Sequence, residues 1–186
     1  YKPKMISKFS LDPAVVDCIV FWTKNPSHMI NRLNELQDYK YYFQFTLNPY
    51  EKDIESKIPD LNKRIEIFKR LSDKIGKEKV VWRYDPILTN PKYNVEFHKE
   101  AFADIADRLK DHTERCMLGF IDHYQHIKKT VSCYDIKPLQ MEEIEEMAIS
   151  FKKSIDQYPQ IVLDTCTNKV NLTHLDIPGG MCIDGK

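Results

Sequence analysis

Hydrophobic runs and amphipathic patterns alternate along the chain. Five short runs rich in β-branched and aromatic residues predict strands, at residues 17–25, 40–47, 79–85, 115–122 and 160–166. Between them, apolar residues recur three or four positions apart, which predicts helices. These helices are expected from Ser27 to Leu36, from near Ile65 to Gly76, from Asn94 to Lys110, and from Gln140 to Tyr158. The order indicates a βα series.

The near-continuous apolar character of the strands predicts a parallel sheet covered by helices. Such a sheet can close as a (β/α) barrel or stay open and doubly wound. The single adjacent glycine pair, Gly179-Gly180, cannot supply the glycine-rich turn of a dinucleotide-binding sheet or a phosphate loop. Polar residues end every strand, as a barrel rim requires. We therefore expect an α/β fold that is a parallel (β/α) barrel-like segment, an incomplete TIM-type barrel.

Length and charge narrow the picture further. The 186 residues suit one domain, 1–186, without an internal linker. Because five strands fall short of eight and the chain starts at Tyr1, we expect a fragment of a longer chain. With 28 basic and 28 acidic residues, the charge disfavours nucleic acid as a partner, except through a local patch. The oligomeric state stays open.

Nothing in the sequence indicates export or membrane insertion. No stretch of 18 apolar residues occurs and no signal peptide begins the chain. The five cysteines form no C-x-x-C pair, which suits free thiols in a reducing compartment. We expect a cytoplasmic protein without a membrane partner.

Candidate functional residues lie at the strand ends, where the loops of a parallel fold converge. We expect catalysis by Arg83, Asp85 and Asp122. Substrate contacts are expected from Lys24, Asn25, Thr46, Asn48, Thr165 and Cys166.

Strand alternation separates these side chains from the core. Arg83 and Asp85 share one strand face, whereas Trp82 and Tyr84 share the other. The aromatic face suits the helix layer, so Arg83 and Asp85 are expected to point into the barrel mouth. The same alternation groups Gln44, Thr46 and Asn48 opposite Phe43, Phe45 and Leu47. An arginine beside an aspartate can hold a carboxylate or phosphate and accept a proton. The alternative is a structural ion pair.

Metal binding is not expected within this segment. His123 and His126 follow Asp122 with a spacing that resembles half of a metal site, but no further ligands follow at suitable spacing. Cys166 and Cys182 are the two cysteines that could reach the mouth, and two thiolates are too few for a cluster. The plainer interpretation of the cysteines is that they are buried, inert thiols.

Several blocks of the chain resemble one family. They are residues 16–26 (VDCIVFWTKNP), 42–46 (YFQFT), 82–86 (WRYDP), 120–122 (FID), 165–166 (TC) and 182–184 (CID). Together they resemble a prokaryotic domain-of-unknown-function family of radical-SAM-like, spore-photolyase-like proteins. The resemblance covers essentially the whole chain, and the FWTKNP and WRYDP blocks are specific.

The resemblance implies a barrel with pieces that this chain lacks. Full-length members begin with an extra strand upstream of Tyr1 and end in a C-x-x-x-C-x-x-C segment beyond Lys186, which resembles a ligand set for an iron–sulfur cluster. An iron–sulfur cluster and S-adenosylmethionine are therefore implied for the full-length protein, and no cofactor for this segment. The matched positions are Thr23, Lys24, Asn25, Thr46, Arg83, Asp85, Asp122, Cys166 and Cys182; His123 and His126 do not belong to the pattern.

Two functions remain as hypotheses. The first is a radical-SAM-like enzyme that uses this segment as barrel wall and acts on a small polar or anionic substrate at the carboxyl ends of the strands. The second is a non-catalytic or acid–base barrel module that binds a small polar ligand. The sequence fixes neither the substrate nor the reaction.

Overall fold

The five expected strands form one parallel sheet. The computed structural model describes residues 8–121, 133–166 and 170–183. The strands are β1 (Ile19–Thr23), β2 (Tyr41–Thr46), β3 (Val80–Ile87), β4 (Arg115–Phe120) and β5 (Val162–Thr165). Each pairs with the next in the order β1-β2-β3-β4-β5. The α/β prediction is confirmed. Over the described residues the sheet is open, with β1 and β5 at its edges, as in an incomplete barrel.

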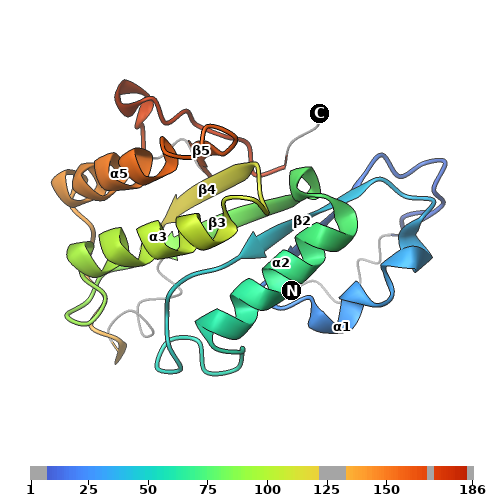
Figure 1. Ribbon diagram of the computed structural model, residues 1–186, viewed down its shortest axis with the longest axis horizontal. Coiled ribbons are helices and arrows are strands. Elements are labelled where there is room, and N and C mark those ends of the chain that lie inside the picture. Colours follow the sequence, from blue (N-terminus) through green and yellow to red (C-terminus); the bar gives the residue numbers. More distant parts are fainter. Residues whose placement is uncertain (1–7, 122–132, 167–169, 184–186) are drawn as a thin grey trace.

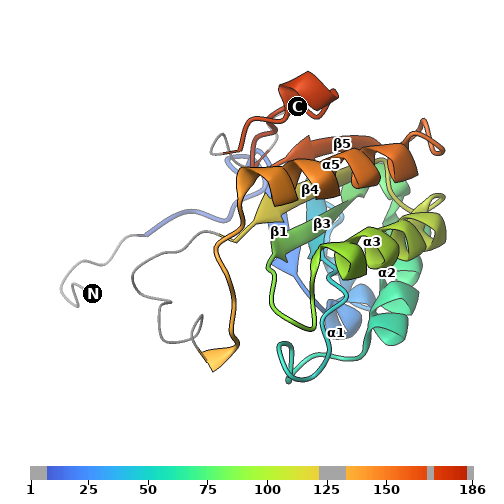
Figure 2. The ribbon, with the colours of Figure 1, turned by 90° about the vertical axis from the view of Figure 1, so that its left-hand side faces the viewer.

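Helices cover one face of this sheet. The long ones are α2 (Leu61–Ile75), α3 (Val95–Leu109) and α5 (Met141–Ile155), and Figures 1 and 2 show them in one layer against the strands. Shorter helical pieces are α1 (Ser27–Ile30), η1 (Leu33–Leu36), η2 (Lys77–Lys79) and η4 (Thr173–Leu175). None of the helices that the structure describes has the length and apolar character needed to cross a bilayer.

The helix boundaries follow from local capping. Asp60 accepts a hydrogen bond from the Lys63 N–H, and Asn94 accepts one from the Phe97 N–H, both at 2.9 Å. Gly76 ends α2 with φ of +95°, which favours glycine. The expected helix from Ser27 to Leu36 is instead two short pieces, α1 and η1, separated at Asn31 and Arg32. Asparagine has low helix propensity, which favours the break.

The alternation predicted for the strands is confirmed. Aromatic side chains on one face of the sheet pack against the helices: Trp82 stacks on Phe102 with centroids 4.9 Å apart, and Phe102 stacks on Phe151 at 4.2 Å. Phe43, Phe45 and Leu47 belong to the same core. The opposite face, called the concave face below, carries Gln44 and Arg83. Its polar side chains therefore lie outside the helix-side core.

Candidate functional site

Arg83 is the centre of a polar cluster on the concave face. Its Nη1 donates to Oε1 of Gln44 at 2.9 Å, and its Nη2 donates to Sγ of Cys166 at 2.8 Å. The same Nη2 forms an ion pair with the Asp85 carboxylate. Arg83 is 4% exposed. These four residues, together with Trp22, are called the Arg83 cluster.

Trp22 forms the solvent side of the cluster. The guanidinium carbon of Arg83 lies 5.0 Å from the centre of the Trp22 ring, within range of a cation–π interaction. Trp22 comes from the edge strand β1 and is 58% exposed. On the other side, Nη1 of Arg83 also contacts Sδ of Met117 at 2.9 Å. The guanidinium is therefore held between an exposed ring and buried polar partners.

Arg83 and Cys166 influence each other's pKa. Burial by itself would lower the pKa of Arg83, but its hydrogen bonds to Asp85 and Cys166 outweigh burial and the pKa is raised. Burial raises the pKa of Cys166, as does the neighbouring Cys182 thiol, while Arg83 opposes both. Arg83 is thus a permanent cation, and Cys166 rests mainly as a thiol at neutral pH.

Asp85 is positioned by its backbone as well as by Arg83. The Asn48 side chain donates through Nδ2 to the Asp85 carbonyl at 2.9 Å, and its Oδ1 accepts from the Asp85 N–H at 3.0 Å. The Asp85 carboxylate lies over Gly119 of β4, where any side chain would collide with it. The Asp85 side chain is 28% exposed, so one side of the carboxylate stays accessible to solvent.

Two further predicted residues lie on the strands of the cluster. Thr46 is opposite Arg83 in the parallel register of β2 and β3, so the two share the concave face. Thr165 shares its strand face with Leu163, which belongs to the helix-side core. The Thr165 side chain is buried, and its Oγ1 has no hydrogen-bond partner within the described residues.

The side chains of Lys24 and Asn25 have partners other than the residues of the Arg83 cluster. The Lys24 ammonium pairs with Glu55, whose carboxylate also forms an ion pair with the fully buried Arg64 at 2.8 Å. Oδ1 of Asn25 accepts a hydrogen bond from the N–H of Ser27, the first residue of α1, at 3.2 Å. Among the described residues, neither side chain forms a hydrogen bond or ion pair with Arg83. Their substrate contacts stay predictions, and the structure gives each a structural partner.

Asp122 lies outside the described residues, as do His123 and His126. Its expected place beside Arg83 and Asp85 therefore stays a prediction. Asp122 follows β4 by two residues, and β4 is the neighbour of β3 in the sheet.

The thiols that lie together are Cys166 and Cys182. Their sulfur atoms are 3.0 Å apart, and Sγ of Cys182 also donates to the Cys166 carbonyl at 3.1 Å. Over residues 8–121, 133–166 and 170–183, no three His, Cys, Asp or Glu side chains converge as a metal site. An iron–sulfur cluster does not fit a donor set of two thiols. Cluster ligands, if the protein has them, would come from outside these residues.

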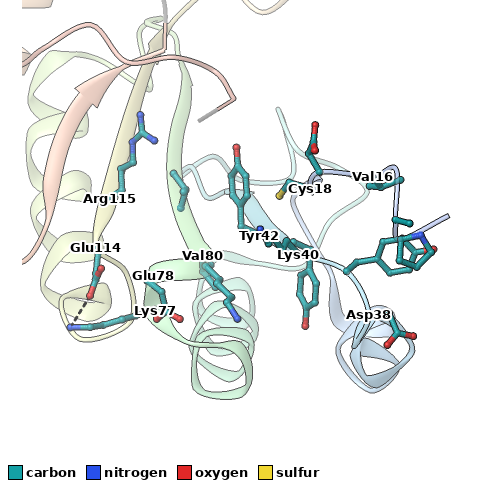
Figure 3. Close-up of a pocket in the computed structure, with 17 residues that line it drawn as sticks. Val16, Cys18, Asp38, Lys40, Tyr42, Lys77, Glu78, Val80, Glu114 and Arg115 are labelled. Atoms are coloured by element: carbon teal, nitrogen blue, oxygen red, sulfur yellow. Dashed lines mark ion pairs between the residues drawn. The ribbon is translucent and has the colours of Figure 1, made fainter. Parts of the chain in front are cut away.

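A pocket opens at the other end of the sheet. It has a volume of about 1080 Å³ and lies at the amino ends of β1 to β4, among Cys18, Lys40, Tyr42, Val80 and Arg115. Figure 3 shows its rim, where Lys77 pairs with Glu114 at 3.5 Å. Charged side chains of both signs line it, and one of them, Arg115, pairs with the buried Asp164 at 2.6 Å. We therefore place the candidate site at the Arg83 cluster, where the polar groups converge.

Comparison with known proteins gives the family. A family described as "Domain of unknown function (DUF1848)" matches residues 1–186. The chain belongs to this DUF1848 family. A search of curated proteins finds no match. The resemblance of the sequence to a domain-of-unknown-function family is thereby confirmed.

A solved structure shares the fold of this DUF1848 chain. It is a spore photoproduct lyase complexed with dinucleoside spore photoproduct, with a TM-score of 0.53 and 17% sequence identity. The match covers 76% of this chain and 49% of that one, so the chain spans about half the length of that protein. At this identity the likeness concerns the fold. The expected likeness to a spore photolyase is supported at the level of the fold.

Sequence reasoning missed the role of Trp22. No role was assigned to the Trp22 side chain from the sequence, yet its ring lies against the Arg83 guanidinium. The signal was strand parity: Trp22 is in register with Gln44, and Gln44 was already assigned to the concave face. The contact between Cys166 and Cys182 was also understated, because the two lie sixteen positions apart in the sequence.

Proposed function

We propose that this chain is the barrel wall of a radical-SAM-like enzyme and that its Arg83 cluster contacts a small polar or anionic substrate. The observation that carries the proposal is the buried Arg83 guanidinium on the concave face, with the exposed Trp22 ring packed against it. Arg83 would hold a carboxylate or phosphate through its fork of N–H donors. Asp85 and Asp122 would arrange hydroxyl or amine groups and accept a proton.

The alternative of a purely structural ion pair explains less. A buried ion pair costs desolvation that an apolar pair of similar size would avoid, so its stabilising value is small. Here the pair also keeps one face toward solvent, because the Asp85 side chain is 28% exposed. An exposed tryptophan beside it gains little from burial and offers an aromatic surface for a ligand. These features suit a binding site better than a core.

The fold supports the enzyme class. The solved neighbour is a spore photoproduct lyase with a dinucleoside bound, and a small organic ligand is proposed here by analogy. An iron–sulfur cluster and S-adenosylmethionine would be held by residues outside those described, since two thiols are too few to bind an iron–sulfur cluster. S-adenosylmethionine would supply the carbon radical. The residues of this chain would bind and orient the substrate, and we propose that the protein acts in the cytoplasm.

Binding at Arg83 can be tested with Trp22 as the reporter. Titration of the purified protein with inorganic phosphate should change the Trp22 emission, because the ring stacks on the guanidinium that would bind the anion. Arg83→Gln should abolish the change, and Trp22→Phe should remove the signal, leaving that of the buried Trp82. Lys92→Met, which removes an exposed cation paired with Glu51 and Asp53, should leave the titration unchanged.

The enzyme class needs a separate test. The full-length protein, purified without oxygen, should contain iron, and after reduction it should form 5′-deoxyadenosine from S-adenosylmethionine. A protein without iron or 5′-deoxyadenosine formation would contradict the enzyme class. Phosphate binding in that protein would then favour the second function, a module that binds a small polar ligand.

A further inference from the structure

Two cysteines beside Arg83 lie at near-bonding distance. Sγ of Cys166 and Sγ of Cys182 are 3.0 Å apart, although sixteen residues separate them in the chain. We propose that Cys166 and Cys182 form a reversible disulfide, made by exchange with a small-molecule disulfide. The inference does not depend on the proposed function, because it concerns the side chains of this chain alone.

The backbone brings the two residues together. After β5 the chain returns alongside it: the Thr165 N–H donates to the Pro178 carbonyl at 3.0 Å, and the Gly180 N–H donates to the Thr165 carbonyl at 2.7 Å. Residues 177–182 are called the strap below. A Cβ atom on Gly180 would lie 2.7 Å from Oδ2 of Asp164 and 3.0 Å from Nη2 of Arg115. Glycine therefore lets the strap approach β5 closely enough for the sulfurs to meet.

Cys182 is also held from the concave face. Nε2 of Gln44 donates to the Cys182 carbonyl at 2.6 Å, while the Cys182 thiol donates to the Cys166 carbonyl at 3.1 Å. A disulfide bond is about 2.05 Å long. The two sulfur atoms therefore need to approach each other by only roughly 1 Å.

The surroundings suit thiol–disulfide exchange. Cys182 is partly exposed and Cys166 is 9% exposed, so an incoming disulfide meets Cys182 first. Nη2 of Arg83 lies 2.8 Å from Sγ of Cys166. A cation at this distance favours the thiolate, the reactive form of cysteine, and so offsets part of the rise that burial causes in the pKa of Cys166. Arg83 would thus assist the second step of the exchange.

The exchange balances in two steps. The Cys182 thiolate attacks one sulfur of the small disulfide RSSR. A mixed disulfide forms, and the released RS⁻ takes up the proton that Cys182 lost. The Cys166 thiolate then attacks Sγ of Cys182 and expels the second RS⁻, which takes up the proton from Cys166. Two cysteine thiols are oxidised and one RSSR is reduced to two RSH.

The chain contains its own comparison thiols. Cys18 and Cys133 are exposed, and Cys116 is fully buried. Burial raises the pKa of Cys116 well above its usual value, so this thiol is inert. A Cys18→Ser/Cys133→Ser background removes the exposed thiols, which would otherwise form disulfides between molecules, and leaves the Arg83 cluster unchanged.

Oxidation of this background protein by glutathione disulfide tests the proposal. We expect two thiols to disappear together, with a mass decrease of about 2 Da for the two hydrogens lost, and a tryptic peptide in which Cys166 is linked to Cys182. Reduction with dithiothreitol should restore both thiols. With Cys166→Ser added, Cys182 should instead retain one glutathione as a mixed disulfide, because the resolving thiol is absent.

Three results would overturn the proposal. The first is a stable glutathione adduct on Cys182 in the protein that keeps Cys166. The second is that the background protein loses no thiol in excess glutathione disulfide, while a parallel sample that retains Cys18 is oxidised at Cys18. The third is a linked peptide that joins Cys182 to Cys116. Each is independent of phosphate binding and of iron content, so failure here leaves the proposed function standing.

Discussion

Gly119 leaves the space that Asp85 occupies. Gly119 lies on β4 and Asp85 on the neighbouring β3, and a Cβ atom built on Gly119 would come within 2.9 Å of the Asp85 Cβ and closer still to its carboxylate. The Asp85 Cβ is fixed to the backbone, so the side chain cannot simply rotate away. The geometry of the Arg83–Asp85 ion pair thus depends on the absence of a side chain at position 119.

Gly119→Ala should therefore destabilise the fold and disturb the ion pair. We expect the free energy of unfolding to fall by about 1–3 kcal/mol, the usual range for an overpacked buried site. Urea denaturation measures it. In an Asp85→Ala background the carboxylate is gone, so the same substitution should cost less, and a double-mutant cycle should give a coupling energy above about 0.5 kcal/mol. Additive effects would contradict the contact.

Asn48 should be essential for the position of Asp85. Its side chain satisfies both the N–H and the carbonyl of Asp85, and it is 1% exposed. Asn48→Ala leaves these backbone groups without their partner and should lower the free energy of unfolding by about 2–4 kcal/mol. Asn62→Ala, which removes an exposed contact to Arg108, should change it by less than about 0.5 kcal/mol. Equal effects of the two substitutions would refute the assigned role.

The sequence predicted the sheet well because strand patterns are local. The alternation of Val80 to Asp85 was enough to separate the aromatic face from Arg83, and Asn94 was already the expected start of its helix. The partners of the side chains were harder to predict. Lys24 has the sequence environment of a rim cation, yet it pairs with Glu55, a residue of the long loop after β2. Such pairing depends on the path of a loop, which no periodicity encodes.

The same limit applies to Cys166 and Cys182. A separation of sixteen residues does not by itself predict that the two sulfurs meet. The contact follows only from the path of the strap, which runs beside β5. His98 is a further example: its helical position indicates a core-facing residue, but its polar partners come from β3 and from the segment after it. Long-range contacts of this kind are fixed by topology.

His98 should make the stability of the fold depend on pH. It is fully buried, accepts at Nδ1 from the Tyr84 hydroxyl at 2.8 Å and donates from Nε2 to the Leu88 carbonyl at 2.8 Å; this assignment gives a neutral ring. Burial lowers the pKa of His98 to about 4. The unfolded chain, with a histidine pKa of about 6.5, then binds more protons than the folded one between these values.

The contribution of neutral His98 to the free energy of unfolding is fully present above pH 6.5. It should be lost as the pH falls toward 4, by about 3 kcal/mol in total. Urea denaturation at pH 7 and pH 4.5 measures the difference. In His98→Gln the decrease should be smaller, because the titrating group is gone. Phe102→Leu, a substitution in the same core, should lower stability at both pH values and keep the wild-type decrease. If His98→Gln showed the full wild-type decrease between pH 7 and pH 4.5, His98 would not be the source of the pH dependence.

Glu55 should matter far more to folding than Lys24 does, although the two form one ion pair. Glu55 is nearly buried and also pairs with Arg64, whose side chain is fully buried. Burial lowers the pKa of Arg64, and the Glu55 charge opposes this effect. Nη2 of Arg64 further donates to the Asn48 carbonyl at 2.9 Å, so Glu55 and Arg64 join the long loop to the end of β2.

Glu55→Gln should therefore leave a buried guanidinium without its counter-charge and lower the free energy of unfolding by about 3–5 kcal/mol. Lys24→Met removes a partner that is 40% exposed and should cost less than about 1 kcal/mol, as surface pairs do. Urea denaturation of both variants gives the comparison. Arg64→Met/Glu55→Met removes both buried charges and should recover part of the loss of Glu55→Gln, because no unpaired charge stays buried. A double variant less stable than Glu55→Gln would show that the Arg64 hydrogen bond to Asn48 outweighs the ion pair.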